Sequence, residues 1–220
     1  MGLIAPLEPQ DSPPSLADKA FAAIRDMIVS LELPPGAVVH EAKLIAELGV
    51  GRTPIREAVR MLEQAKLVEV YPRRGVFVTS VNISDLASLS EVREVLEAHA
   101  ARLAAERASE SERQELAALI EESRGKDKLD RRALIDLDRR IHGCIYRCTH
   151  NDFLETTLDE YYVLALRIWF LALDRVERLD EAVSEHGELL EAIRAGDGTR
   201  AERSMRRHVQ GFEQAVRKVL

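Results

Sequence analysis

The sequence predicts a mainly α-helical protein, with an N-terminal winged helix-turn-helix followed by a C-terminal all-α bundle of six helices. Two observations support this prediction. Before residue 81, the apolar pattern and the glycine and proline residues give the order helix, short helix, tight turn, helix and β-hairpin. After residue 80 there is no proline, and apolar residues recur at helical spacing almost without a break. The chain therefore divides into a small mixed domain and a larger helical one.

Composition places the chain among ordinary globular proteins. Its 220 residues are 46% hydrophobic and 31% charged, which excludes disordered, collagen-like and disulfide-stapled classes. No apolar run approaches the ~20 residues of a membrane span, and no basic region precedes the short apolar stretch at the start. Cys144 and Cys148 form no CxxC pair, and two thiols one helical turn apart suit a reducing compartment. We therefore expect a cytoplasmic protein with no membrane partner.

The first ordered domain is expected over residues 15–80, after a disordered tail at residues 1–14. The tail carries four of the 8 prolines and no basic residue. The expected elements are helices at about 15–33, 41–48 and 53–65 and strands at 68–71 and 76–78. A basic turn joins the two strands.

Charge is distributed unevenly along the chain. The net charge is −7, from 31 basic and 38 acidic residues, which by itself argues against nonspecific binding to a polyanion. Residues 16–80 hold 9 basic and 8 acidic side chains, whereas residues 81–220 hold 22 and 28. Within residues 50–76 the numbers are 6 basic and 3 acidic. This distribution allows a local positive face on an acidic molecule.

The third helix of this domain has one apolar and one basic face. The apolar residues that should pack inward are Ile55, Ala58, Val59 and Leu62. Thr53, Arg56 and Arg60 fall on the opposite side. We expect Thr53 as the N-cap and Pro54 as the first helical residue, which presents Arg52 and Arg56 at a rigid helix start.

Arginines at the start of a helix suit nucleic acid. A positive helix N-terminus attracts phosphate oxygens, and the guanidinium fork can meet two acceptors on guanine for ~1 to 3 kcal/mol of discrimination. An isolated basic helix is more often a solvated face. Here the order of the elements favours DNA, because the second helix of a helix-turn-helix enters the major groove.

These segments resemble the DNA-binding domain of GntR-family transcription regulators over about residues 16–80. The resemblance is carried by Gly51–Val59, preceded by Leu33–Gly36 and followed by Arg73–Val78. It implies that Arg52, Thr53 and Arg56 contact DNA, with Arg60 on the same face, and that Arg73, Arg74 and Gly75 form a wing tip near the minor groove or backbone. The chain departs from the family at Lys66, where glycine is usual.

The second domain is expected over residues 81–220. Its six helices are expected at about 84–107, 110–124, 130–149, 152–176, 179–195 and 198–219. The breaks between them are expected at Ser109, 125–129, Asn151, about Arg178 and 196–198.

Four polar residues of this domain lie on apolar helical stripes. Asp138 and His142, at positions i and i+4, share one stripe, and His186 and His208 each lie on another. A single histidine in such a place is more often a hydrogen-bonded core residue than a ligand. Three imidazoles and one carboxylate in one bundle suit a divalent metal, with zinc, nickel, manganese and iron as candidates.

The helical domain and these four residues resemble the FCD effector domain of the FadR subfamily, in its shorter, VanR-like branch. The resemblance implies that the metal helps to hold a small organic acid. Among the four candidate ions we expect zinc first. It also places an asparagine at Asn151, for which a helix cap is an equal explanation. Arg93 lies on the stripe that should face the cavity and suits a bidentate anion, the alternative being an ion pair with Glu97. Arg167 is a weaker candidate for the acid.

Together these features predict a ligand-responsive transcription regulator. We expect a homodimer that reads a two-fold symmetric operator in double-stranded DNA, with a divalent metal and a small carboxylate effector in each bundle. The resemblance favours release of DNA on effector binding, hence repression. The alternatives are a regulator that senses the metal itself and a metal-dependent hydrolase or lyase, which the absence of an HExxH or comparable motif makes the weaker reading. We therefore expect no enzyme and no catalytic residues.

Overall fold

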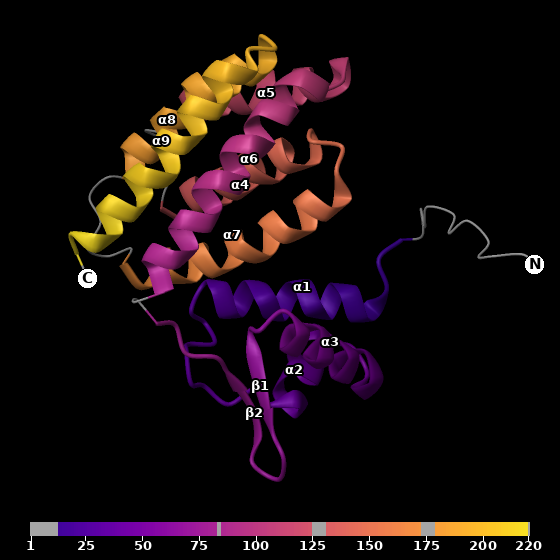
Figure 1. The fold of residues 1–220 in the computed structure, drawn as a ribbon. Coiled ribbons are helices and arrows are strands. Elements are labelled where there is room, and N and C mark those ends of the chain that lie inside the picture. Colours follow the sequence, from indigo (N-terminus) through magenta and orange to yellow (C-terminus); the bar gives the residue numbers. More distant parts are fainter. Residues whose placement is uncertain (1–12, 83–84, 125–130, 173–178, 220) are drawn as a thin grey trace, which may run out of the picture. The chain divides into compact units, whose positions relative to one another are not determined.

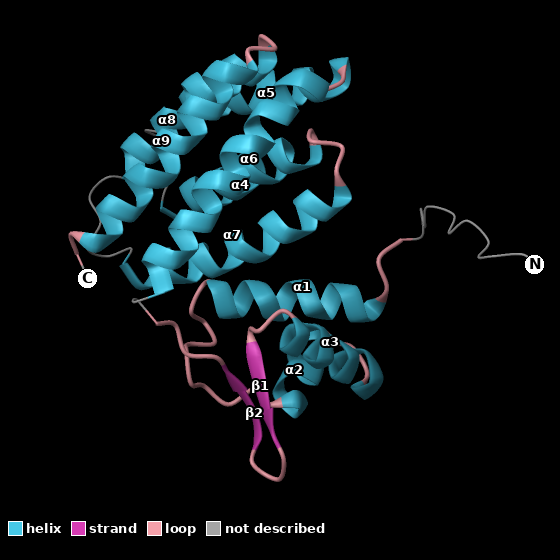
Figure 2. Cartoon of the chain, viewed as in Figure 1, coloured by secondary structure: helices cyan, strands magenta, loops and turns pink. Residues whose placement is uncertain are grey.

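The computed structural model describes residues 13–82, 85–124, 131–172 and 179–219. The chain forms two compact units, Met1–Ser80 and Val81–Leu220, and both are built mainly from helices (Figure 1, Figure 2). This confirms the predicted fold class. Most of the expected tail at residues 1–14 lies outside the described residues.

The first unit has the predicted order of elements. It contains α1 (Leu16–Val29), α2 (Glu41–Leu48), α3 (Arg52–Gln64), β1 (Val68–Tyr71) and β2 (Gly75–Val78). Ser15 caps α1 and forms a capping box with Asp18. The core of this unit contains Ile24 and Ile28 of α1 and Ile55 and Leu62 of α3, all fully buried.

Helix α1 is shorter than predicted. Periodicity alone extended it to about Leu33, but it ends at Val29, and Leu31 adopts a left-handed conformation with φ 61°. The amide of Leu33 then donates to the carbonyl of Met27. The chain therefore turns back before the proline pair, and Leu31 and Leu33 continue the apolar pattern outside the helix.

The two strands pair as an antiparallel hairpin (Figure 2). Val68 faces Val78, and Tyr71 faces Gly75 across the turn. Gly75 has a φ of 111°, a conformation that side chains rarely adopt. The glycine therefore permits the tight wing that the sequence predicts.

The second unit contains the six predicted helices within the described residues. They are α4 (Asp85–Arg107), α5 (Glu110–Arg124), α6 (Arg131–Arg147), α7 (Asp152–Ala172), α8 (Leu179–Arg194) and α9 (Gly198–Arg217). Several expected boundaries lie outside the described residues: the helix starts at 84 and 130, the end at 173–176, and the breaks at 125–129 and Arg178. No helix in the described ranges is long and apolar enough to cross a membrane.

Helix α4 is central to this unit because it packs against α6, α7, α8 and α9. A single arginine of α5 links the C-terminal ends of α4 and α8 through hydrogen bonds. The Arg113 guanidinium of α5 donates to the carbonyls of Ala105 and Ala108 at the end of α4 and to those of Ile193 and Arg194 at the end of α8. A cation at helix C-termini also complements the helix dipoles. Arg113 thereby links the C-terminal ends of α4 and α8, two of the helices that surround the buried polar residues of this unit.

Candidate functional site

The basic face of α3 is exposed. Arg52, Thr53, Arg56 and Arg60 all lie on the surface of the first unit, while the apolar residues of the opposite face are buried. The side chain of Arg56 is 67% exposed. Exposure leaves these groups available to an approaching polyanion.

The predicted N-cap of α3 is wrong by two residues. Thr53 is not the N-cap: Gly51 holds that position with extended backbone (φ −74°, ψ 174°), and no side chain caps the helix. Arg52 is therefore the first helical residue and Pro54 the third. Pro54 is tolerated there because the first helical amides have no intrahelical acceptor. The helix start exposes backbone amides beside Arg52.

Glu41, at the start of α2, contacts Arg56. Its Oε2 lies 3.6 Å from the Arg56 Nε, which joins the two helices of the helix-turn-helix across their exposed side. Sequence analysis missed this partner because the two residues are 15 positions apart and meet only through the fold. An exposed ion pair of this kind contributes little stability, so Arg56 can exchange Glu41 for another partner.

The tip of the hairpin presents two further arginines. Arg73, Arg74 and Gly75 are all exposed, and the Arg74 guanidinium lies 5.9 Å from the centroid of the Tyr71 ring. Arg73 has a left-handed φ of 64°. The turn therefore projects positive charge from the end of the two strands.

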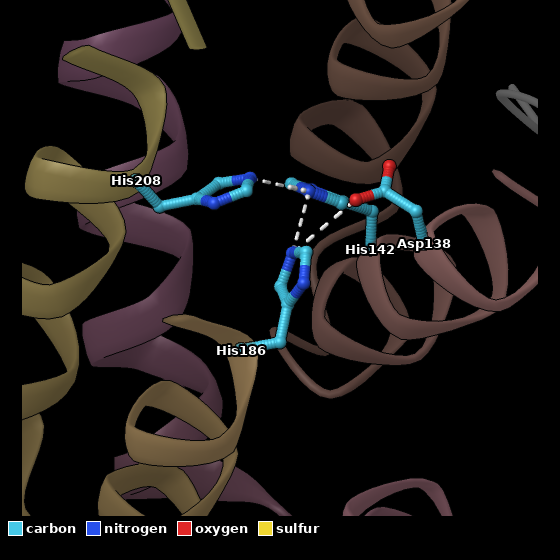
Figure 3. A group of neighbouring side chains, drawn as sticks. All are labelled: Asp138, His142, His186 and His208. Carbon is cyan, nitrogen blue, oxygen red and sulfur yellow. Dashed lines mark hydrogen bonds and ion pairs between the residues drawn. The ribbon is translucent and has the colours of Figure 1, made fainter. Parts of the chain in front are cut away.

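In the second unit, four predicted residues come together. Asp138 and His142 extend from α6, His186 from α8 and His208 from α9, and their ligand atoms all lie within 4.8 Å of one another (Figure 3). The Nε2 of His142 lies 3.3 Å from that of His208 and 3.4 Å from that of His186, and the latter lies 3.4 Å from Asp138 Oδ1. All three imidazoles are buried, and Asp138 is half-buried. The cluster thus joins three nitrogens and one carboxylate oxygen.

These four residues fit a divalent metal ion. In a tetrahedral site with bonds of about 2.0–2.1 Å, neighbouring ligand atoms are about 3.3 Å apart, which agrees with the three separations of 3.3, 3.4 and 3.4 Å given above. The four side chains converge in Figure 3. Imidazole nitrogens that turn their lone pairs toward one another form no hydrogen bond. A cation among them would give these lone pairs a partner. Nitrogen and carboxylate donors suit zinc and other first-row divalent ions.

The surroundings keep two of the four donors, His186 and Asp138, in their ligating forms. Burial, reinforced by the neighbouring His208, holds the pKa of His186 well below its ordinary value, so its imidazole is neutral. Burial alone would raise the pKa of Asp138, but the nearby imidazoles and a hydrogen bond from Tyr162 lower it on balance. The Tyr162 hydroxyl donates to Asp138 Oδ2 at 2.5 Å. This bond orients the carboxylate so that its other oxygen faces the imidazoles.

Arg93 is buried and forms the ion pair that sequence analysis held as the alternative. It is 3% exposed, and its Nε donates to Glu97 Oε1 at 2.6 Å. The guanidinium carbon lies 5.9 Å from the Tyr162 ring and 5.4 Å from the Phe212 ring. Tyr162 also contacts Asp138, so Arg93 stands next to the metal-ligand cluster.

Glu97 also reaches the cluster itself. Its Oε2 lies 3.1 Å from His142 Nδ1. Burial favours the neutral acid, yet the Arg93 guanidinium and the His142 ring lower the pKa of Glu97 on balance, so it is a carboxylate. Sequence analysis considered Glu97 only as a partner for Arg93. The second contact joins α4 to α6, so no helical spacing in the sequence pointed to it.

The other two predicted effector residues lie on α7 and just before it. Arg167 is 2% exposed on α7, and burial lowers its pKa to about 10. The Asn151 side-chain oxygen accepts from the Leu154 amide at 3.2 Å and so caps α7.

A winged helix-turn-helix with exposed arginines, combined with a helical unit that gathers buried ligating groups, defines a DNA-binding regulator with a ligand-binding domain. The family comparisons agree. Residues 16–78 match the family described as bacterial regulatory proteins, gntR family, and residues 88–211 match the FCD domain. The chain therefore belongs to the GntR family of transcriptional regulators and carries an FCD domain. Its class is that of DNA-binding regulators, not of enzymes.

Curated relatives match over most of the chain. The probable D-xylose utilization operon transcriptional repressor of Paenarthrobacter nicotinovorans is 31% identical over 196 residues, which cover 86% of this chain and 85% of the relative. The HTH-type transcriptional repressor RspR of Escherichia coli (strain K12) is 25% identical over 202 residues, with 90% and 88% covered. Among solved structures, E. coli McbR/YncC has a TM-score of 0.83 at 22% identity, covering 94% of this chain and 99% of that one. This last likeness supports the fold.

Proposed function

We propose that this regulator is a homodimeric repressor whose helical unit binds one divalent metal ion and a small carboxylate effector, and which releases its operator when the acid binds. The observation that carries the proposal is the convergence of Asp138, His142, His186 and His208. Groups of this kind are unfavourable to bury without a partner. A metal ion satisfies all four at once.

Zinc is the ion we propose first, with nickel, manganese and iron as alternatives. Three neutral nitrogens and one carboxylate oxygen suit each of these ions, and the choice among them depends on supply and geometry. When bound, the ion supplies positive charge that attracts a carboxylate. The protein contributes the four ligands and the Tyr162 hydroxyl that orients Asp138.

Arg93 is the residue we propose for the acid. Its guanidinium is buried beside Tyr162, and its Nε donates to Glu97. The terminal nitrogens form a planar fork that suits a carboxylate. We include Arg167 and Asn151 as further effector residues, although the Asn151 oxygen already caps α7.

On DNA, we propose that Arg52, Thr53, Arg56 and Arg60 read the major groove and that Arg73, Arg74 and Gly75 contact the minor groove or backbone. The exposure of all seven residues supports this assignment. One short helix covers few base pairs, so a symmetric dimer on a two-fold operator is the arrangement that gives useful specificity. Two of the relatives are named as transcriptional repressors, which favours repression for this protein.

The effector can act only through a different affinity for the two states of the dimer. Coupling of about 1–3 kcal/mol, or roughly 5- to 150-fold in affinity, is typical. We expect the acid to bind more tightly to an arrangement in which the two reading helices no longer match the half-sites. Reciprocally, operator DNA should weaken binding of the acid by the same factor.

The test is an operator-binding titration with the full-length protein and DNA from its own promoter region. Binding is measured without additions, with zinc, with a panel of small organic acids, and with both. We expect acid to weaken DNA binding at least 5-fold in the presence of zinc. Release by zinc alone would instead identify a metal sensor. Failure of every acid and metal to change DNA binding would contradict the proposal.

A further inference from the structure

Glu97 occupies a central position between two functional groups of the helical unit. Its side chain is fully buried in α4. One oxygen, Oε1, accepts a hydrogen bond of 2.6 Å from Arg93 Nε, and the other, Oε2, lies 3.1 Å from His142 Nδ1. A buried carboxylate is unfavourable unless cationic or donor groups surround it. Arg93 meets this need at Oε1, whereas Oε2 has no hydrogen-bond partner among the described residues and has the His142 ring as its neighbour.

The two ring nitrogens of His142 contact different groups. Nδ1 faces Glu97 Oε2 and lies 3.1 Å from the Tyr146 hydroxyl. Nε2 faces the Nε2 atoms of His186 and His208. A neutral imidazole carries one proton and one lone pair on its two nitrogens. A carboxylate beside Nδ1 holds the proton there, so the lone pair on Nε2 points to the centre of the cluster.

Arg93 is oriented by the same carboxylate. Because Nε donates to Glu97, the plane of the guanidinium is held along this bond, and the two terminal nitrogens are the further donors that the side chain can offer a second carboxylate. The rings of Tyr162 and Phe212 lie within 6 Å of its central carbon. These contacts restrict the rotation of a side chain that would otherwise adopt many rotamers.

We propose that Glu97 is a positioning residue that serves both ligands: its Oε2 holds His142 with Nε2 ready for the metal, and its Oε1 holds Arg93 with its fork ready for the acid. This inference rests on the proposed metal and acid sites. It adds that one carboxylate sets the geometry of both, so a single substitution should disturb two groups on different helices.

Glutamine is an informative replacement because it keeps the size of the side chain and removes one acceptor. A glutamine amide has one oxygen that accepts and one NH2 group that donates. If its oxygen accepts from Arg93, the NH2 group faces His142 Nδ1 and favours the tautomer with the proton on Nε2. If its oxygen faces His142, the NH2 group meets the Arg93 Nε–H. The substitution must therefore either move the His142 proton to Nε2 or break the contact with Arg93.

The first test is nitrogen NMR of the metal-free, full-length protein. In the wild-type chain we expect His142 to carry its proton on Nδ1 and the Arg93 Nε–H to exchange slowly with water. In Glu97→Gln we expect the His142 tautomer to change or the Arg93 signal to lose its protection. Glu94→Gln is the matched control, because Glu94 lies on the same helix and accepts from Arg206 Nη1 at 2.9 Å near the surface. It should change neither signal.

The second test measures the affinity of the same proteins for zinc alone. We expect Glu97→Gln to weaken zinc binding about 10- to 100-fold, the usual effect of losing a partner of a ligating histidine, and Glu94→Gln to leave it unchanged. Wild-type zinc binding that Glu97→Gln does not weaken would overturn the inference while leaving the metal site intact. Absence of zinc binding by the wild type would refute the proposed function.

The NMR result on the wild type decides the matter even if Glu97→Gln fails to fold. A proton on Nε2 of His142 in the metal-free wild-type chain would contradict the proposed role of Glu97.

Discussion

The two candidate sites of this regulator differ in the free-energy cost of keeping their polar side chains without a bound partner. The arginines of α3 are exposed, so they need no desolvation and are common on any protein surface. They indicate DNA binding only because they belong to a helix-turn-helix. The cluster on α6, α8 and α9 places three imidazoles in the interior. Buried polar groups without partners are unfavourable. The difference teaches that burial of ligating groups indicates a ligand directly, whereas exposed charge indicates one only through the fold.

The largest expected effect is on the exposed surface. Arg56→Ala should weaken specific operator binding by at least about 30-fold, because a bidentate arginine–base contact contributes ~1 to 3 kcal/mol and the dimer contains two of them. The measurement is fluorescence anisotropy with operator and scrambled DNA, with circular dichroism as the check on folding. Arg203→Ala, which removes an exposed positive charge from α9, is the control. Full retention of sequence preference by Arg56→Ala would remove α3 from the DNA-reading role.

A smaller effect is expected at the buried site. Arg93→Lys keeps a positive charge beside Glu97 but removes the planar fork, so acid binding should weaken by about 10-fold or more, the equivalent of one charged hydrogen bond. Calorimetry with an acid that releases the operator measures this, and zinc content should stay the same. Arg206→Lys, at the surface pair with Glu94, is the matched control. Acid affinity equal to that of the wild type would return Arg93 to a purely structural role.

The smallest effect concerns the end of α3. Lys66 adopts a left-handed φ of 58°, which is unfavourable by about 1–2 kcal/mol for a residue with a side chain. Lys66→Gly relieves this strain and loses part of the gain to the greater freedom of glycine in the unfolded chain. We expect stabilisation of the first unit by about 1 kcal/mol, measured by denaturant unfolding of the full-length protein. Lys19→Gly, at an exposed position within α1, should destabilise the same unit; an unchanged or lower stability of Lys66→Gly would contradict the account of this turn.

Much of the fold follows from local patterns in the sequence. The helical stripes, the glycine turn before α3 and the basic hairpin turn are all local, so the order of elements could be predicted. The start of α3 was misplaced because the backbone of Gly51 supplies the cap without a side chain. The end of α1 was misplaced because apolar residues continue beyond it for packing reasons.

In the candidate sites, too, contacts within one helix could be predicted from the sequence and contacts between helices could not. The grouping of Asp138 with His142 is set by a helical spacing of four, which sequence shows directly. The contacts of Glu41 with Arg56 and of Glu97 with His142 join different helices. Such pairs depend on the packing of the chain, and no local pattern in a single sequence reveals them.

The most direct test of the account is the metal content of the helical unit. The full-length protein is stripped with a chelator, reloaded with zinc, dialysed and measured by elemental analysis beside His208→Ala and the control His99→Ala, whose histidine is exposed on α4. We predict about one zinc per chain in the wild type and the control, with a higher melting temperature when zinc is bound, and a loss of both in His208→Ala. Equal zinc in all three proteins, or none in the wild type, would contradict the central claim.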